Sequence, residues 1–156
     1  FNPNELYIGI FTSLEVIGAL LGGTAITVIA INKKLISFIA FLGIILLCIS
    51  LSASSNSIYM YSLSILIFGM ATACYSALQS TIIYLNSTPE LRSSTFSLLT
   101  IAIGCGALGS LNIYLMSTFF TTEEISNIMA IDGLLVGLFF LIVASVRFPI
   151  YKFFEK

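Results

Sequence analysis

The sequence predicts an all-α, polytopic helical membrane bundle, and its composition and the pattern of its apolar runs lead to that prediction. Hydrophobic residues make up 58% of the 156-residue chain and charged residues only 8%, whereas a typical soluble domain has about 25% charged residues. Five apolar runs fall within or above the roughly 17 to 25 residues that one membrane-crossing helix needs. None of the runs alternates strictly between polar and apolar residues, which argues against a transmembrane β-barrel. Because the chain has only six basic residues and no basic patch, nucleic acid is not an expected partner.

The five expected spans follow one another through short polar connections and form one membrane domain over residues 1–156. The second span contains no acidic, basic or amide side chain, and a helix of this kind is expected to face lipid over much of its surface. Each of the three cysteines falls inside a span, where a thiol normally acts as an apolar packing residue. The predicted spans cover residues 6–31, 35–51, 58–85, 96–119 and 128–146.

The basic residues predict which end of each span faces the cytoplasm. Lys and Arg close to span ends remain on the cytoplasmic side of a membrane. We therefore expect the chain to begin outside the cell membrane and to end in the cytoplasm. All the basic residues fall on that one side, in alternate connections or after the last span: Lys33, Lys34, Arg92, Arg147, Lys152 and Lys156.

The connection between the third and fourth spans, "NSTPELRSSTF", concentrates charge in an otherwise apolar chain. Pro89 disfavours helix at Thr88 and can itself begin a new helix. Thr88 is therefore expected to cap that helix, with Glu90 in its first turn. Arg92 is expected at the level of the lipid headgroups. One interpretation of the stretch is simply a turn with a topology anchor.

A second interpretation comes from a resemblance that extends over residues 88–115, "TPELRSSTFSLLTIAIGCGALGSLNIYL". This stretch resembles the connection between the tenth and eleventh helices of the major facilitator superfamily, most closely the branch of drug and siderophore exporters. The chain has Ala107 where that branch often has Pro. The resemblance implies helices eight to twelve of a twelve-helix transporter, whose first seven helices would precede this chain. The matching positions are Pro89, Glu90, Arg92, Ser93, Gly104, Leu108, Gly109 and Ser110.

Glu15 is the main candidate for chemistry within the membrane. An ionisable residue in lipid costs several kcal/mol and therefore tends to be functional. At helical spacing Glu15 shares one face with Thr12, Gly18 and Gly22, which places it on the packed side of its helix. In an exporter of this superfamily such a carboxylate can bind a proton or a cationic substrate. The alternative is a structural Glu that is hydrogen-bonded to a neighbouring helix or hydrated near the outer interface.

Polar residues of the third and fourth spans are candidates for lining a central cavity. The resemblance places the third span at the cavity of the transporter, although these side chains would equally serve to hydrogen-bond neighbouring helices. Asn112 in the fourth span is too polar for lipid and is expected to face the bundle. Glycines in the fourth span permit either close helix packing or bending during gating. The cavity candidates are Thr12, Thr72, Tyr75, Ser76, Gln79 and Asn112, and the glycines are Gly104, Gly106 and Gly109.

The sequence thus predicts a secondary transporter that exports a small amphipathic molecule by alternating access, driven by proton antiport. The direction of transport and the substrate class follow from the resemblance alone. The expected partners are the lipid bilayer, the small-molecule substrate, protons and the preceding helices of the same protein. No cofactor, metal site or enzymatic activity is expected, because the chain has no His and no cluster at metal-ligand spacing. The alternative is a non-transporting receptor or assembly subunit with a transporter-like fold.

Overall fold

The computed structural model describes residues 5–29 and 33–154, with side chains described except at residues 5–6, 106–107, 110 and 144–154. Within these ranges the chain is helical apart from short connections and has no strand. The predicted all-α fold is therefore confirmed. The helices are α1 (Glu5–Val28), α2 (Lys34–Ala53), α3 (Ile58–Asn86), α4 (Arg92–Gly104), α5 (Gly106–Met116) and α6 (Thr122–Phe154).

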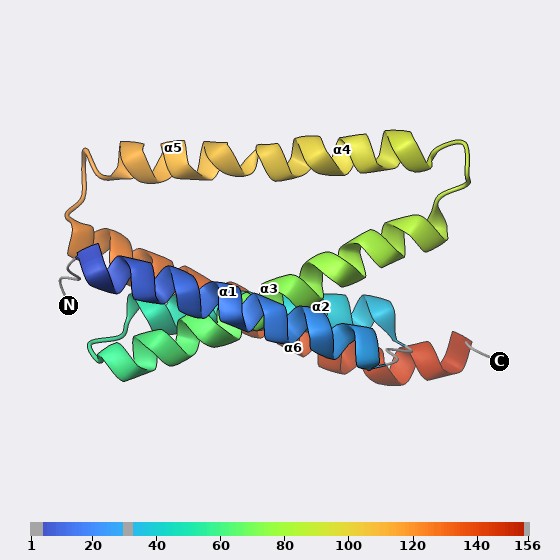
Figure 1. Cartoon of the computed structure of the whole chain (residues 1–156), viewed down its shortest axis with the longest axis horizontal. Coiled ribbons are helices and arrows are strands. Elements are labelled where there is room, and N and C mark those ends of the chain that lie inside the picture. The colour runs from blue at the N-terminus through green and yellow to red at the C-terminus, as the bar shows by residue number, and fades with distance from the viewer. Residues whose placement is uncertain (1–4, 30–32, 155–156) are drawn as a thin grey trace.

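Four of these helices, α1, α2, α3 and α6, are long and apolar enough to cross a membrane. The predicted span at residues 96–119 differs, because it is divided into α4 and α5 at Cys105. The two pieces lie end to end in one line (Figure 1). At 1.5 Å per residue, residues 92–116 extend about 37 Å, enough for the roughly 30 Å hydrocarbon core. The fourth predicted span is therefore a broken helix of sufficient length.

The four long helices pack in the order α1, α3, α2, α6 rather than in chain order. Helix α3 lies between α1 and α2, and the Tyr75 ring of α3 stacks on the Phe38 ring of α2 with centroids 4.5 Å apart. Helices α1 and α3 run in the same direction, since both extend from the end of the bundle near the N-terminus toward the opposite end (Figure 1). Helices α2 and α6 run antiparallel to each other.

Glycines allow α1 and α3 to approach until their backbones touch. A Cβ atom at Gly22 would lie 2.8 Å from the Cα atom of Met70, and one at Gly18 would lie 3.1 Å from the carbonyl carbon of Leu66. On the facing helix, a Cβ atom at Gly69 would lie 3.0 Å from the carbonyl carbon of Glu15. Helix pairs in lipid associate largely through such close packing, because lipid tails are as apolar as the side chains. The predicted packed face of α1 is therefore the face that contacts α3.

Helices α2 and α6 meet in the same way. A Cβ atom at Gly133 of α6 would lie 2.8 Å from the Leu46 carbonyl oxygen of α2. A Cβ atom at Gly137 would lie 3.1 Å from the Gly43 carbonyl oxygen. Gly133 and Gly137 thus form a packing face of α6 with a defined partner surface on α2.

Two serine hydroxyls add hydrogen bonds across the same pair. Ser50 of α2 donates to the Ala130 carbonyl oxygen at 2.5 Å. In the opposite direction, Ser126 of α6 donates to the Ala53 carbonyl oxygen at 2.8 Å. Hydrogen bonds between membrane helices contribute about 0.6 kcal/mol each on average, so they supplement the glycine contacts rather than replace them.

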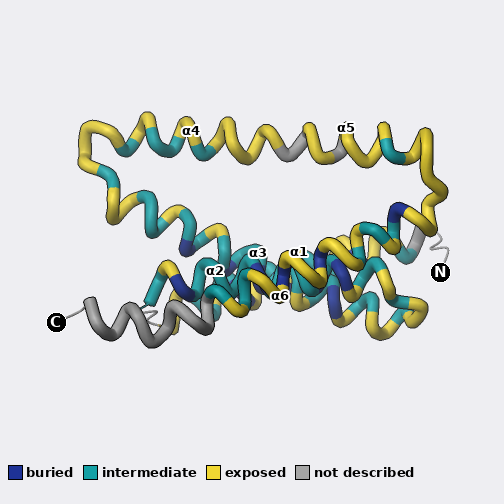
Figure 2. The backbone as a smooth tube through the Cα atoms, turned by 180° about the vertical axis from the view of Figure 1, so that it is seen from behind, coloured by how far each residue is buried: buried dark blue, intermediate teal, exposed yellow. Residues whose placement is uncertain are grey.

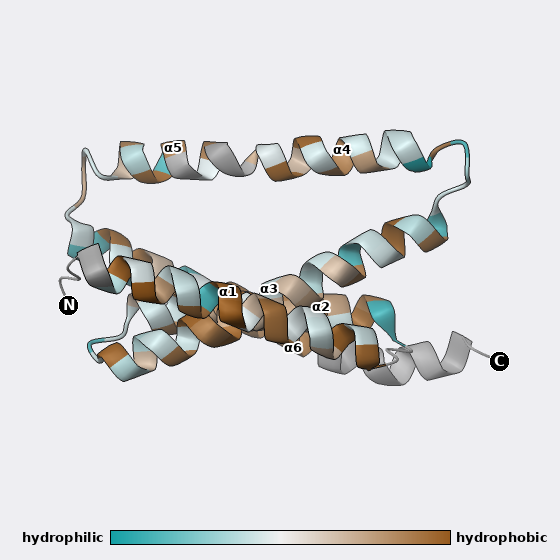
Figure 3. Cartoon of the chain, in the orientation of Figure 1, coloured by the Kyte–Doolittle hydropathy of each residue, from teal (hydrophilic) through white to brown (hydrophobic). Residues whose placement is uncertain are grey.

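Helices α4 and α5 stand apart from the four packed helices in both views (Figures 1 and 2). Most of their described residues are exposed, among them Leu98 at 64% and Ile101 at 64%. Large apolar side chains are exposed on the packed helices too, such as Leu20 at 65%. Figure 3 shows that hydrophilic residues gather mainly near helix ends and turns. Contiguous apolar surface of this extent is compatible with lipid as the surrounding solvent and not with water.

The connection between α3 and α4 differs in detail from its prediction. Residues Pro89 to Leu91 form a turn, and helix α4 begins only at Arg92. The Thr88 backbone carbonyl accepts hydrogen bonds from the backbone N–H groups of Leu91 and Arg92. The expectation that Thr88 caps a helix beginning at Pro89 was therefore wrong, because the backbone closes a tight turn there before the helix starts.

The two classes of glycine predict opposite responses to an added methyl group. We expect Gly22→Ala to destabilise the bundle by about 1–3 kcal/mol, because the new Cβ atom would overlap the Met70 backbone. Gly104→Ala, where nothing lies within 4 Å of the added atom, should leave stability unchanged or raise it slightly. Thermal unfolding in a non-ionic detergent, followed by a thiol-reactive dye that reaches the buried Cys48 and Cys74, measures the difference in a Cys105→Ala background. Equal destabilisation by both variants would contradict the assignment of contacts.

Candidate functional site

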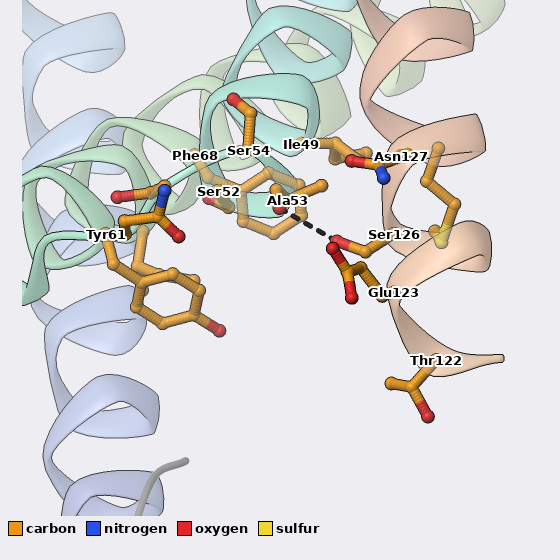
Figure 4. Close-up of a pocket in the computed structure, with 14 residues that line it drawn as sticks. Ile49, Ser52, Ala53, Ser54, Tyr61, Phe68, Thr122, Glu123, Ser126 and Asn127 are labelled. Carbon is orange, nitrogen blue, oxygen red and sulfur yellow. Dashed lines mark hydrogen bonds between the residues drawn. The ribbon is translucent and has the colours of Figure 1, made fainter. Parts of the chain in front are cut away.

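A pocket of about 880 Å³ opens between α2, α3 and α6 at the end of the bundle where α2 ends and α6 begins. Figure 4 shows its walls, with α6 facing the end of α2 and the first turns of α3 across the opening. Its described lining consists of Ile49, Ser52, Ala53, Ser54, Ser55, Asn56, Tyr61, Ile65, Phe68, Thr122, Glu123, Ser126, Asn127 and Met129. We call this the acidic-end pocket, because the acidic residues Glu123 and Glu124 lie at this end.

The lining of the acidic-end pocket is amphipathic. Hydroxyl and amide groups come from the end of α2, the following connection and the first turns of α6. The remaining surface is aliphatic and aromatic, with Phe68 of α3 lying in the wall of the opening (Figure 4). Small-molecule sites commonly have volumes of about 300–1,000 Å³ and combine apolar walls with a few polar groups. The pocket therefore has the size and the chemistry of a small-molecule site.

Local contacts hold the pocket walls in place. The Ser126 hydrogen bond to the Ala53 carbonyl oxygen joins α6 to the end of α2 beside the opening (Figure 4). On the opposite wall, the Tyr61 ring packs edge to face on the Phe11 ring of α1, with centroids 4.7 Å apart. Because Phe11 is buried, the position of the Tyr61 ring is set by the α1–α3 contact.

A capping box fixes where α6 starts and hence where its pocket residues lie. The Thr121 backbone N–H donates to a Glu124 carboxylate oxygen at 2.8 Å, and the Glu124 N–H donates to the Thr121 hydroxyl oxygen at 3.3 Å. This reciprocal pair gives hydrogen-bond acceptors to two backbone N–H groups at the helix start, those of Thr121 and Glu124. Glu124 is thereby engaged with Thr121, whereas the neighbouring Glu123 belongs to the pocket lining.

Charge divides the bundle into two unlike ends. Among the described lining residues of the acidic-end pocket, Glu123 carries the only formal charge. The basic residues Lys33, Lys34 and Arg92 lie at the opposite end, beside the starts of α2 and α4. The separation by the length of a helix exceeds the screening length of about 8 Å in physiological salt. Glu123 therefore acts at the pocket without compensation from these cations.

Glu15 lies at the middle of the α1–α3 contact, and its side chain is half-buried. Its backbone carbonyl group faces Gly69 of α3, as expected for a residue on the packed side of α1. Thr12, predicted on the same face, is exposed and donates its hydroxyl proton to the Ile8 carbonyl oxygen at 2.9 Å within the helix. The structure does not bring either residue into the acidic-end pocket.

The predicted polar stripe of α3 is spread over different surroundings. Tyr75 stacks on Phe38 of α2, and the Thr72 hydroxyl donates to the Phe68 carbonyl oxygen at 2.7 Å within α3. Gln79 is half-buried, while Ser76 is exposed. These residues lie toward the basic end, beyond the part of α3 that lines the acidic-end pocket.

The candidates in the fourth predicted span lie on the detached α4–α5 segment. Asn112, Gly104 and Gly109 are all exposed, and a Cβ atom at either glycine would meet nothing within 4 Å. Gly106 is the first residue of α5, and its surroundings lie outside the described residues. Asn112 is therefore exposed on a segment that stands apart from the packed helices, and the expectation that it faces the bundle stays a prediction.

The charged connection between α3 and α4 forms a contact of its own. The guanidinium carbon of Arg92 lies 3.9 Å from the centre of the Tyr84 ring, over its face. This cation–π contact joins the start of α4 to the last turn of α3 and contributes about 0.5–1 kcal/mol at an exposed site. Pro89 and Glu90 are exposed in the turn between the two helices. The connection thus sets the angle at which α4 leaves the bundle.

A second, smaller cavity of about 310 Å³ lies between α1, α2 and α3 nearer the basic end. All of its described lining residues are apolar, including Phe41, Ile44 and Met70. The described lining offers no side chain that would orient a polar ligand. The chemistry of this cavity suits an acyl chain.

Comparison with known proteins gives no relative for this chain: no family model matches it, and no curated protein or solved structure matches it significantly.

Sequence reasoning missed the acidic-end pocket, although the signal was present. The connections "SASSNS" and "TTEEISN" supply most of its polar residues, and alternating topology places both at the same end of the bundle. What the sequence did not provide was the packing order, which sets the end of α2 beside the start of α6.

The pocket predicts water-accessible positions on α6 next to lipid-facing ones. In a cysteine-free background, we expect Asn127→Cys, which lines the pocket, to react rapidly with a membrane-impermeant maleimide added from the acidic end. Leu134→Cys lies two turns further along the same candidate membrane span, where the side chain is 45% exposed and where we expect lipid around it. It should react at least about tenfold more slowly, because a thiol must ionise in water to react. Similar rates in proteoliposomes would mean that the pocket is not hydrated from that side.

Proposed function

We propose that the chain forms part of a secondary membrane transporter of the major facilitator type, which exports a small amphipathic molecule by alternating access in exchange for protons. It lies in the cell membrane with the acidic end outside and the basic end in the cytoplasm. The separation of Lys33, Lys34 and Arg92 from the acidic end supports this orientation, because basic residues near span ends favour the cytoplasm.

The observation that carries the proposal is the broken helix α4–α5. At the break, the Leu108 N–H donates to the Cys105 carbonyl oxygen, three residues away, at 2.9 Å. Cys105 has φ −62° and ψ −14°, which is the tighter 3₁₀ geometry often found at functional hinges within helices. Interrupted helices of this kind are typical of the moving and binding parts of secondary transporters.

The glycines of the chain support a division between rigid and movable parts. Most of those in α1, α2, α3 and α6 are used in close contacts with a neighbouring helix, the exceptions being Gly9 and Gly23 of α1, so these helices form tightly packed pairs. Gly104 and Gly109 have no such contact, so their effect on α4–α5 is to lower its resistance to bending. Alternating access requires bodies that stay packed and a segment that changes shape.

Glu15 supplies the proton-coupling group in this proposal. It is a carboxylate in the middle of a membrane-crossing helix, half-buried beside the α1–α3 contact. An ionised carboxylate is costly at membrane depth, so the conformation that exposes it to water is favoured when it is charged, and the conformation that buries it is favoured when it is neutral. This dependence of conformation on protonation is how a proton gradient would drive the change of conformation.

Replacing Glu15 by Gln in the native protein that contains this chain should abolish proton-driven export while leaving membrane insertion intact. The amide keeps the size and hydrogen-bonding capacity of the side chain but cannot release a proton. Everted membrane vesicles with an imposed pH gradient, loaded with the fluorescent amphiphiles ethidium and Nile red, measure this. Asp132→Asn is the matched control, since Asp132 is an exposed carboxylate on α6. Unchanged export by the Glu15→Gln protein would remove Glu15 from the mechanism.

The transporter proposal also predicts the size of the native polypeptide. Intact mass spectrometry of the protein taken from its membrane should give a mass two to three times the 16.9 kDa of this chain, because seven further helices are required for a two-halved cavity. A mass near 16.9 kDa would instead favour a receptor or assembly subunit, because five spans cannot enclose such a cavity alone.

A further inference from the structure

We propose that the acidic-end pocket binds an organic cation, specifically an ammonium group attached to an apolar body. The site lies between α2, α3 and α6, and none of its lining residues belongs to the proton-coupling or cavity candidates discussed above. It therefore does not depend on the transport proposal and can be tested by binding alone.

The charge at the pocket selects for a cation. Glu123 is the one charged group in the described lining, whereas the neighbouring Glu124 is engaged in the capping box with Thr121. Lys34 and Arg92 are the first residues of α2 and α4, which begin at the far end of the bundle. A carboxylate at a pocket mouth with apolar walls attracts a cation more strongly than one in open water, because the walls lower the local dielectric constant.

The aromatic rings select for an organic cation. In Figure 4 the Tyr61 ring and the Glu123 carboxylate border the opening from α3 and α6, with Phe68 in the wall between them. Ring faces attract ammonium groups, and combinations of rings with a carboxylate are used to recognise quaternary ammonium ligands. Tyr61 is held by its contact with Phe11, so little ordering of this ring is required on binding.

The volume of the pocket and its apolar floor, which we define as Ile49, Ile65 and Met129, argue against a bare metal ion. A Ca²⁺ ion requires six to eight oxygen ligands at about 2.3–2.6 Å, whereas this pocket of about 880 Å³ carries a single carboxylate in its described lining. The aliphatic side chains of Ile49, Ile65 and Met129 would leave a hydrated ion beside apolar surface. They would instead pack against the apolar body of an organic cation.

Two sources could provide this chemistry. One is a free amphiphilic cation that reaches the pocket from water. The other is the choline head group of a phospholipid in the adjoining leaflet. Both present a quaternary ammonium group next to apolar matter, and they differ in whether the group is attached to a phosphodiester.

Ligand-observed NMR titrations of the purified full chain in dodecyl maltoside test the proposal with three probes. We expect benzyltrimethylammonium to bind more tightly than choline, because its ring adds contact with the apolar floor. Choline should bind more tightly than 3,3-dimethylbutanol, which has the same shape but no charge. Glu123→Gln should weaken binding of benzyltrimethylammonium about fivefold.

The neighbouring carboxylate provides the matched control. Glu124→Gln removes the same charge one residue away and preserves the capping box, since Gln serves at this position as well as Glu. It should change the affinity less than about twofold, because Glu124 does not line the pocket and its exposed carboxylate is engaged with Thr121. The unfolding temperatures of both variants, measured with the thiol-reactive dye, should equal that of the parent chain. Equal weakening by the two variants, or equal binding of choline and 3,3-dimethylbutanol, would overturn the proposal.

Competition identifies the source of the cation. Displacement of benzyltrimethylammonium by dihexanoyl phosphatidylcholine but not by dihexanoyl phosphatidylglycerol would assign the site to a lipid head group. Displacement by neither lipid would assign it to a free cation. Equal displacement by both would show that acyl chains compete for the pocket, and it would overturn recognition through the ammonium charge.

Discussion

The architecture depends on the direct contact of helix backbones at glycine. In water, burial of apolar side chains would drive α1 against α3 and α2 against α6, but lipid offers an equally apolar environment. What remains is the dispersion attraction between closely fitting surfaces, and it is largest where no Cβ atom separates the backbones. Gly22 against Met70 and Gly133 against Leu46 are such contacts. The Ser50 and Ser126 hydrogen bonds between α2 and α6 are formed because these close approaches bring the two helices together.

Much of the fold could be predicted from the sequence, because lipid imposes strong rules on composition and length. The runs that became α1, α2, α3 and α6 are long and apolar, and no other regular structure satisfies their backbone groups in hydrocarbon. The packed face of α1 was also predictable, since Gly18 and Gly22 recur at helical spacing. The break at Cys105 was not, because "GCGALG" is compatible with a continuous, tightly packed helix.

The candidate site was less predictable, and the reason is geometric. Hydrophobic periodicity identifies which side of a helix is packed but not which helix lies against it. Tyr75 was polar enough to be a cavity residue, yet its ring stacks on Phe38. Conversely, Glu123 and Asn127 are unremarkable in a polar connection, and they acquire a role only because α6 begins beside the end of α2. The proposed cation site is therefore a product of packing order rather than of a motif.

That packing order also constrains how the protein is made. Helix α1 packs mainly on α3 and not on α2, which follows it in the chain, so its partner within this chain is complete only when residues up to about Cys74 have been synthesised. Helix α2 in turn waits for its second partner until Gly133 and Gly137 of α6 have emerged. Until α3 has been made, the Gly18–Gly22 face of α1 and the adjacent Glu15 lack this partner and are open to lipid or to the insertion machinery. The glycine face of α2 lacks its partner in the same way until α6 has been made. A ribosome stalled after α2 would therefore leave α1 and α2 without a stable contact with each other.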